Sequence, residues 1–259
     1  MKNRIRTMLH VDFRRMFTQP LIWIMIGICF MIPVLILAMT TMMDGSVSVD
    51  PNTGVETVME AYDSAWQIIG SVPGSTGAAM EMSMTSMLNI DMLYFAIAVL
   101  VSIFVSDDYR SGYAKNLFTV RGKKTDYVFS KSITGSVGGG MMLLAYFAGT
   151  TIGGAIAGLP FTMMGFNGMN LALCILSKIL LTPVFVAIFV CMSVIGKQKL
   201  WLSMILSLMT CMFLFNIASI AAPVNATVLH VFICAIGSIL FGVSLGAVSN
   251  LILKKRDIL

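Results

Sequence analysis

Apolar residues gather in six long stretches of this chain, separated by short polar segments. A helix of about 20 apolar residues crosses the hydrocarbon core of a bilayer. The stretches that reach this length are residues 19–42, 86–106, 132–158, 170–196, 200–221 and 228–253. The pattern therefore predicts an all-α fold. We expect a polytopic membrane protein with six transmembrane helices, in a single domain that covers residues 1–259.

The first 17 residues place apolar and basic side chains on different faces of a helix. The apolar face includes Leu9 and Phe13, and the basic positions include Arg4, Arg14 and Arg15. A basic amphipathic helix beside a membrane span lies in the plane of the membrane interface. We therefore expect residues 1–17 to form an interfacial helix in contact with membrane lipid.

The longest polar segment, residues 43–85, joins the first two predicted spans on the outer side. Apolar side chains recur in it at helical spacing, which predicts an amphipathic helix on the outer surface. They are Val55, Val58, Met59, Tyr62, Trp66 and Ile69. Residues 71–78 (SVPGSTGA) are rich in turn-forming residues and predict a break after that helix.

Two kinds of residue in the predicted spans bear on helix packing and shape. Small residues four positions apart allow two helices to approach closely. The third span has three such glycine pairs: Gly135 with Gly139, Gly149 with Gly153, and Gly154 with Gly158. Proline removes a backbone donor and kinks or loosens a helix, so we expect kinks at Pro33 and Pro183. Such kinks serve as hinges in some transporters, although membrane helices also carry proline without that role.

Composition agrees with a membrane setting, and charge indicates an orientation. The chain is 58% hydrophobic and 11% charged, whereas soluble domains are about 45–50% apolar and about 25% charged. Residues 16–106 contain no Lys or Arg, and Lys178 lies alone in the second half. All other basic residues fall in four groups, at residues 2–15, 110–131, 197–199 and 254–256.

Segments rich in Lys and Arg stay on the cytoplasmic side of a membrane. With six spans, all four basic groups and both termini are expected there, and the acidic segment 43–85 is expected outside. Topology therefore explains the net charge of +5. Nucleic-acid binding is a poor explanation, because no basic patch carries interleaved aromatic residues.

The sequence lacks the motifs of catalysis. It has no phosphate-binding loop with a lysine, no H-E-x-x-H and no G-x-S-x-G. Its histidines are His10 and His230, and its five cysteines lie inside apolar stretches without the spacing of a metal site or a disulfide framework. We expect no enzyme activity, catalytic residue, metal ion or cofactor on this chain.

Two charged residues, Asp91 and Lys178, fall within predicted spans. At 1.5 Å per residue, each lies roughly 23–28 Å from the inner boundary, near the outer edge of the hydrocarbon. Charges in lipid pair with one another or face water. The simpler expectation is that each of them reaches separately to the outer headgroups. The alternative hypothesis is that Asp91 and Lys178 share an outer vestibule or pair with each other.

Residues 104–135 carry the most informative pattern, FVSDDYRSGYAKNLFTVRGKKTDYVFSKSITG. It runs from the end of a span through Asp-Asp-Tyr-Arg-Ser-Gly, a short segment with Asn-Leu-Phe, a basic turn, and Tyr-Val-Phe-Ser-Lys at the next span. This order resembles the permease (transmembrane) subunits of the type-2 class of ABC transporters, which are ABC exporters. Two positions differ from the family pattern: Asp stands for the usual Glu, and Tyr113 for the usual Thr. The proline that is common in the family's basic turn is missing.

The resemblance implies a cytoplasmic coupling segment at residues 107–131, with a helix that contacts a separate ATP-binding subunit. The implied contact residues are Asp107, Asp108, Tyr109, Arg110, Gly112, Asn116, Leu117 and Phe118. ATP and magnesium would be held by that subunit, present in two copies, and a second permease copy or paralogue would complete the transporter. The resemblance also implies a bacterial plasma membrane. The interfacial helix would be a second contact with the ATPase.

Several functions stay open at this point. The first is an exporter of an amphipathic or hydrophobic substrate, such as an antimicrobial peptide, a lipid-like molecule or a drug. The second is a non-transporting sensor or immunity component that works with an ATPase. The third is an ion-coupled carrier, for which acids near the midplane or inverted repeats are expected. Residues 107–131 could also be a solvated basic loop that only fixes topology.

Overall fold

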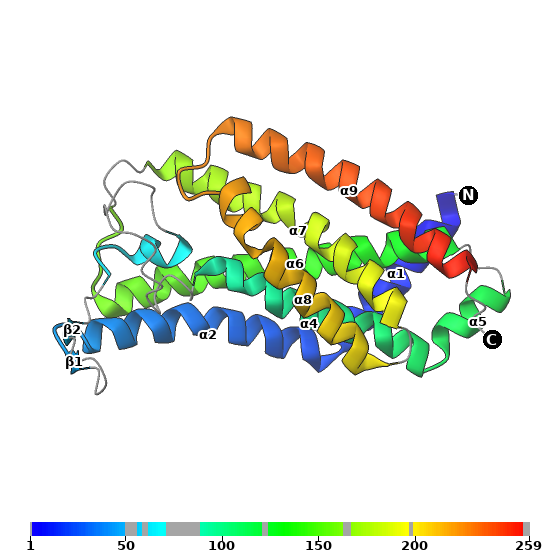
Figure 1. Ribbon diagram of the computed structural model, residues 1–259, viewed down its shortest axis with the longest axis horizontal. Coiled ribbons are helices and arrows are strands. Elements are labelled where there is room, and N and C mark those ends of the chain that lie inside the picture. Colours follow the sequence, from blue (N-terminus) through cyan, green and yellow to red (C-terminus); the bar gives the residue numbers. More distant parts are fainter. Residues whose placement is uncertain are drawn as a thin grey trace.

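The computed structural model describes residues 2–49, 56–58, 62–70, 89–120, 124–162, 167–196 and 199–255. Helices make up almost all of this structure (Figure 1). The α-helices are α1 Lys2–Thr18, α2 Pro20–Met42, α4 Leu93–Arg110, α5 Tyr113–Val120, α6 Lys124–Ala157, α7 Gly168–Gly196, α8 Leu200–Ala221 and α9 Val228–Lys255. The smaller elements are strands β1 Val47–Val49 and β2 Glu56–Val58 and the 3-10 helices η1 Ala65–Ile69 and η2 Ile90–Met92.

Five helical segments of the described chain are long and apolar enough to cross a membrane. They are Pro20–Met42, Ile90–Arg110, Lys124–Ala157, Gly168–Gly196 and Val228–Leu253. Helix α8 is also apolar, but its apolar stretch at Leu200–Leu214 is shorter. The helical fold and the membrane-embedded character therefore agree with the prediction, whereas the count of six spans stays a prediction.

Helices α6 and α7 form the centre of the bundle. Helix α6 contacts α1, α2 and α7, and α7 also contacts α4, α8 and α9. The long helices run along the long axis of the molecule (Figure 1). The outward surfaces of α2, α8 and α9 carry large apolar side chains, including Ile28, Phe213 and Ile239, as expected for helices whose solvent is lipid.

Helices α2 and α6 approach at backbone distance because α6 presents glycine to α2. A Cβ atom at Gly149 would lie 2.2 Å from the Phe30 carbonyl oxygen and 2.8 Å from Pro33 Cγ, and one at Gly153 would lie 2.8 Å from Val34 Cα. The predicted pair Gly149 and Gly153 therefore has a specific partner in the structure. Helix α2 continues past Pro33.

A methyl group at Gly149 is expected to push α2 away from α6. Overpacking of a close contact costs about 1–3 kcal/mol, so we expect Gly149→Ala to lower the midpoint of thermal unfolding in detergent by several degrees. Gly242→Ala in α9 is the matched control, because a Cβ at Gly242 meets nothing within 4 Å. Equal unfolding midpoints for the two variants would contradict the close approach.

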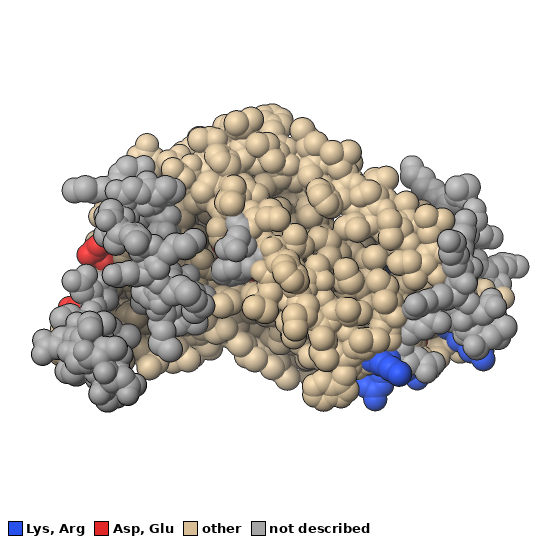
Figure 2. Space-filling model, in the orientation of Figure 1, with Lys and Arg blue, Asp and Glu red and all other residues tan. Residues whose placement is uncertain are grey.

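The two ends of the bundle differ in charge. Helix α1 begins, and α9 ends, at the end where α5 lies (Figure 1). On the face shown in Figure 2, the described Lys and Arg side chains lie at this end and the described Asp and Glu side chains at the opposite end. We call these the basic end and the acidic end. The separation follows the grouping of charges along the sequence.

The described residues between positions 43 and 70 form a different structure from the predicted amphipathic helix. Val58 belongs to β2, which pairs antiparallel with β1, whereas Trp66 and Ile69 lie in η1. The cause is packing against the α6–α7 connection: the Ala65 amide donates to the Pro160 carbonyl over 3.1 Å, and Trp66 Nε1 donates to the Phe161 carbonyl over 3.1 Å. Val55, Met59 and residues 71–78 lie outside the described residues.

Candidate functional site

Three helices meet in a group of buried charges near the basic end. The group consists of Asp12 and Arg15 on α1, Asp108 on the last turn of α4, and Lys131 on α6. We call these four residues the charge network. Asp12, Asp108 and Lys131 are fully buried, and the two acids balance the two bases. Burial of so many charges is costly unless each has a partner.

Lys131 is the centre of the charge network. Its Nζ lies 2.9 Å from Asp12 Oδ1 and 2.7 Å from Asp108 Oδ2, and 3.7 Å from the centre of the Phe104 ring. One ammonium group thereby holds α1 and α4 against α6. An aromatic face adds a favourable interaction for the desolvated cation.

Hydroxyl groups complete the coordination of the two buried carboxylates. Ser130 Oγ donates to Asp12 Oδ2 over 2.5 Å, and the Tyr127 hydroxyl donates to Asp108 Oδ2 over 3.1 Å. Both donors lie on α6. Each buried carboxylate therefore has a hydroxyl donor from α6 in addition to its contact with Lys131.

Arg15 extends the charge network to α5. Its Nη1 lies 2.6 Å from Asp108 Oδ1 and its Nη2 3.9 Å from Asp107 Oδ2, while its guanidinium lies 4.3 Å from the centre of the Tyr113 ring. Burial lowers the pKa of Arg15, but the charge and hydrogen bond of Asp108, together with the charges of Tyr113 and Asp12, outweigh burial and the pKa is raised. Arg15 therefore carries its charge at any physiological pH.

Helix α5 lies beside the charge network and exposes one polar face. It follows a turn at Gly112, whose φ of 73° suits glycine. The Phe118 ring packs edge-on against Tyr127 with 5.3 Å between ring centres. Burial, and then the charges of Asp12 and Asp108, raise the pKa of the Tyr113 hydroxyl. Lys115 and Asn116 are exposed, so α5 is held by aromatic contacts and presents polar side chains outward.

The structure changes the placement of several residues that the family pattern suggested as ATPase contacts. Asp107 and Asp108 lie in the last turn of α4, which continues to Arg110. Carboxylates at the end of a helix oppose its dipole, and the contacts of Arg15 and Lys131 offset this at Asp108. Asp108 and Tyr109 are buried within the chain, whereas Asn116 is exposed and Leu117 is half-buried.

Helix α1 forms as predicted, but one of its faces is occupied by protein. Met8, Asp12 and Met16, four residues apart, are buried, and the helix contacts α6. Leu9 and Phe13 are half-buried and Arg14 is exposed, while the side chain of Arg4 lies outside the described residues. The location of α1 at a membrane interface stays a prediction. The sequence analysis missed Asp12. A feature that could have indicated its role is that Asp12 is the one acidic residue in an otherwise basic helix.

A second buried ion pair lies toward the acidic end. Lys178 Nζ on α7 lies 2.7 Å from Asp91 Oδ1 in η2, and both side chains are about 2% exposed. Ser219 Oγ on α8 donates to Asp91 Oδ2 over 2.8 Å, and the Tyr94 hydroxyl donates to the Lys178 carbonyl over 3.2 Å. The sequence left open whether Asp91 and Lys178 pair, share a vestibule or reach separately to the headgroups, and in the structure they pair. Helix α7 continues past Pro183, so a kink there stays a prediction.

No group of three metal-ligating side chains occurs among the described residues. The five cysteines are buried and unpaired. The chain matches no protein-family model, no curated protein and no solved structure.

Proposed function

We propose that this chain is the transmembrane permease subunit of an ATP-driven ABC exporter, with six spans and both termini in the cytoplasm of a bacterial cell. The proposal rests on the position and contacts of helix α5. It is a short helix with an exposed polar face, it lies between two membrane-spanning segments at the basic end, and it contacts the charge network. Such a helix suits docking of a soluble partner.

The contacts of α5 suggest how a force on it would reach the bundle. Movement of α5 acts on α6 through Phe118 and Tyr127 and on α1 through Tyr113 and Arg15. Because the charge network joins α1, α4 and α6, these helices would move together rather than slide past one another. In the proposal, two ATP-binding subunits bind ATP and magnesium, close, and tilt these helices in each of two permease copies.

The exported substrate is proposed to be amphipathic or hydrophobic: a peptide, a lipid-like molecule or a drug. The bundle has no described soluble domain that could handle large hydrophilic cargo, and its outer helices carry apolar surfaces. A non-transporting sensor that partners an ATPase would use the same α5 contact. Substrate-stimulated ATP hydrolysis with movement of substrate across the bilayer distinguishes the exporter from this sensor.

The exposed face of α5 tests the ATPase contact without disturbing the buried charges. We expect the double variant Lys115→Glu, Asn116→Ala to lose most co-purification with an ATP-binding protein encoded beside this chain, and its ATPase activity in lipid to fall about tenfold or more. Truncating a charged contact at an interface costs about 2 kcal/mol or more. Asn225→Glu is the control, because Asn225 is exposed on the α8–α9 loop at the other end.

Two results would contradict the proposal. One is a wild-type chain that is folded, by its unfolding midpoint, yet forms no complex with the ATP-binding protein. The other is equal loss of binding in the Asn225→Glu control, which would show that α5 is not the contact.

A further inference from the structure

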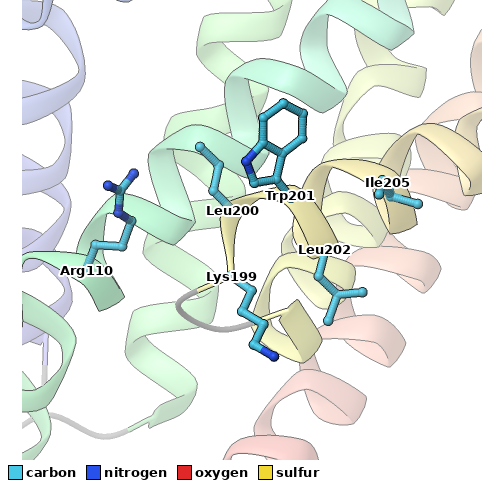
Figure 3. A pocket seen from close by; sticks show the side chains of 6 residues that line it. All are labelled: Arg110, Lys199, Leu200, Trp201, Leu202 and Ile205. Atoms are coloured by element: carbon cyan, nitrogen blue, oxygen red, sulfur yellow. The ribbon is translucent and has the colours of Figure 1, made fainter.

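A shallow pocket opens at the basic end between the last turn of α4 and the first turns of α8 (Figure 3). Its volume is about 530 Å³, and it is lined by Arg110, Lys199, Leu200, Trp201, Leu202 and Ile205. Arg110 comes from α4 and the other side chains from the start of α8 (Figure 3). No member of the charge network lines it, so this pocket is a separate feature.

The two cations of the pocket have no acidic partner in the described part of the chain. Arg110 and Lys199 are exposed, and neither takes part in an ion pair there, since the nearby Asp107 contacts Arg15 instead. The first turn of α8, a helix of 22 residues, has no side-chain cap at Lys199, so its amide groups add positive potential. The pocket therefore favours an anion.

The rest of the pocket is apolar and continues along α8. Trp201 is 78% exposed and Ile205 51% exposed, and the exposed apolar surface goes on through Met209 and Phe213 toward the middle of the helix. Tryptophan is enriched where a membrane meets water. The site thus has cations at the end of the bundle, an indole at the boundary and an aliphatic wall beyond it. A free phosphate ion would contact only the cations, whereas a phospholipid would contact all three parts.

We propose that this pocket binds an anionic phospholipid, with its headgroup at the basic end near Arg110 and Lys199 and an acyl chain along Leu202 and Ile205. Basic pockets between transmembrane helices on the cytoplasmic side bind lipid headgroups of this kind. A two-fold dimer through the same surface is disfavoured, because it would bring the cations of both copies together. The proposal does not depend on the exporter assignment, since it concerns this chain alone.

Fluorescence of Trp201 reports on the site in a Trp23→Phe background, because Trp23 is also exposed, by 55%, whereas Trp66 is buried. The purified full chain in zwitterionic micelles is titrated with phosphatidylglycerol whose acyl chains are brominated, because bromine quenches a contacting indole. We expect saturable quenching that disappears in Trp201→Phe. The double variant Arg110→Gln, Lys199→Gln is expected to bind about 30-fold more weakly, from the usual strength of a basic side chain at an anionic membrane surface taken twice.

The control variant Arg14→Gln, Lys115→Gln removes two exposed cations that do not line the pocket, and it is expected to bind like the wild type. So is Arg110→Lys, Lys199→Arg, which keeps both charges. Equal quenching by brominated phosphatidylcholine would overturn the proposal, as would equal loss in the control. Displacement of the lipid by inorganic phosphate would indicate a free anion site, and loss of quenching upon dimerisation, seen by light scattering, would indicate a second copy as the occupant. Either result also overturns the proposal.

Discussion

Lys131→Met is expected to destabilise the protein by about 3–5 kcal/mol, the usual cost of breaking a buried ion pair by removing one partner. Lys131 is fully buried, and its Nζ contacts both Asp12 and Asp108. Without the ammonium group, Asp108 keeps its ion pair with Arg15. Among the described residues, Asp12 keeps the hydrogen bond from Ser130 and the more distant charge of Arg15. A buried carboxylate without a cation in direct contact is the costly product of this change.

The free energy of unfolding in mixed micelles, from a denaturant titration, measures this effect. Adding Asp12→Asn to Lys131→Met removes the unpaired charge, so we expect the double variant to recover a large part of the loss. Lys115→Met removes an exposed lysine of α5 and is expected to change stability by less than about 0.5 kcal/mol. A Lys131→Met protein as stable as this control would show that the charge network does not hold α1 to the bundle.

The helices of the bundle could be read from the sequence because hydropathy alone sets them. Helix α7 was predicted at residues 170–196 and is found at Gly168–Gly196, and α8 was predicted at 200–221 and is found at Leu200–Ala221. Runs of this length admit no other element, since only helices satisfy all backbone groups of an isolated segment in lipid. Helix α6 starts earlier than predicted, at Lys124. The predicted span stopped at the charge of Lys131, but the helix continues through this residue, whose charge is paired with Asp12 and Asp108.

The segment between α2 and α4 shows where the sequence does not suffice. Its apolar spacing suggested a helix, but Trp66 and Ala65 are fixed by hydrogen bonds to residues near position 160. A contact across so much chain leaves no local signal. Tertiary packing overrides a short periodic pattern.

The two groups of buried charges also differ in how far the sequence predicts them. Asp91 and Lys178 could be placed at one depth from sequence, because each is a lone charge in an apolar span, so that a pair was one of the arrangements to consider. Asp12 could not be matched with Lys131. Asp12 lies among basic residues outside the spans, and only the packing of α1 on α6 brings it to Lys131.

The ion pair of Asp91 and Lys178 leads to the second large effect. Among the described residues, Lys178→Met leaves Asp91 buried with Ser219 as its one side-chain donor. Asp91→Asn leaves the ammonium of Lys178 without its carboxylate. We expect each single variant to lose about 3–5 kcal/mol. The double variant replaces both charges by neutral groups, and such replacements are often close to neutral, so it should be more stable than either single variant.

A double-mutant cycle on the free energy of unfolding tests this pair. Because the double variant is expected to be more stable than either single variant, the coupling energy must exceed each single loss, that is, more than about 3–5 kcal/mol, which lies within the range of close charge pairs. Ser219→Ala serves as the control, because it removes a hydrogen bond to Asp91 and no charge, at a cost of about 1–3 kcal/mol. If the two single losses simply add in the double variant, then each charge is satisfied independently by water or headgroups, and the pair does not bind α7 to the start of α4. If they couple, these helices are joined at the acidic end as α1, α4 and α6 are joined toward the basic end, and α4 is held by buried ion pairs near both of its ends.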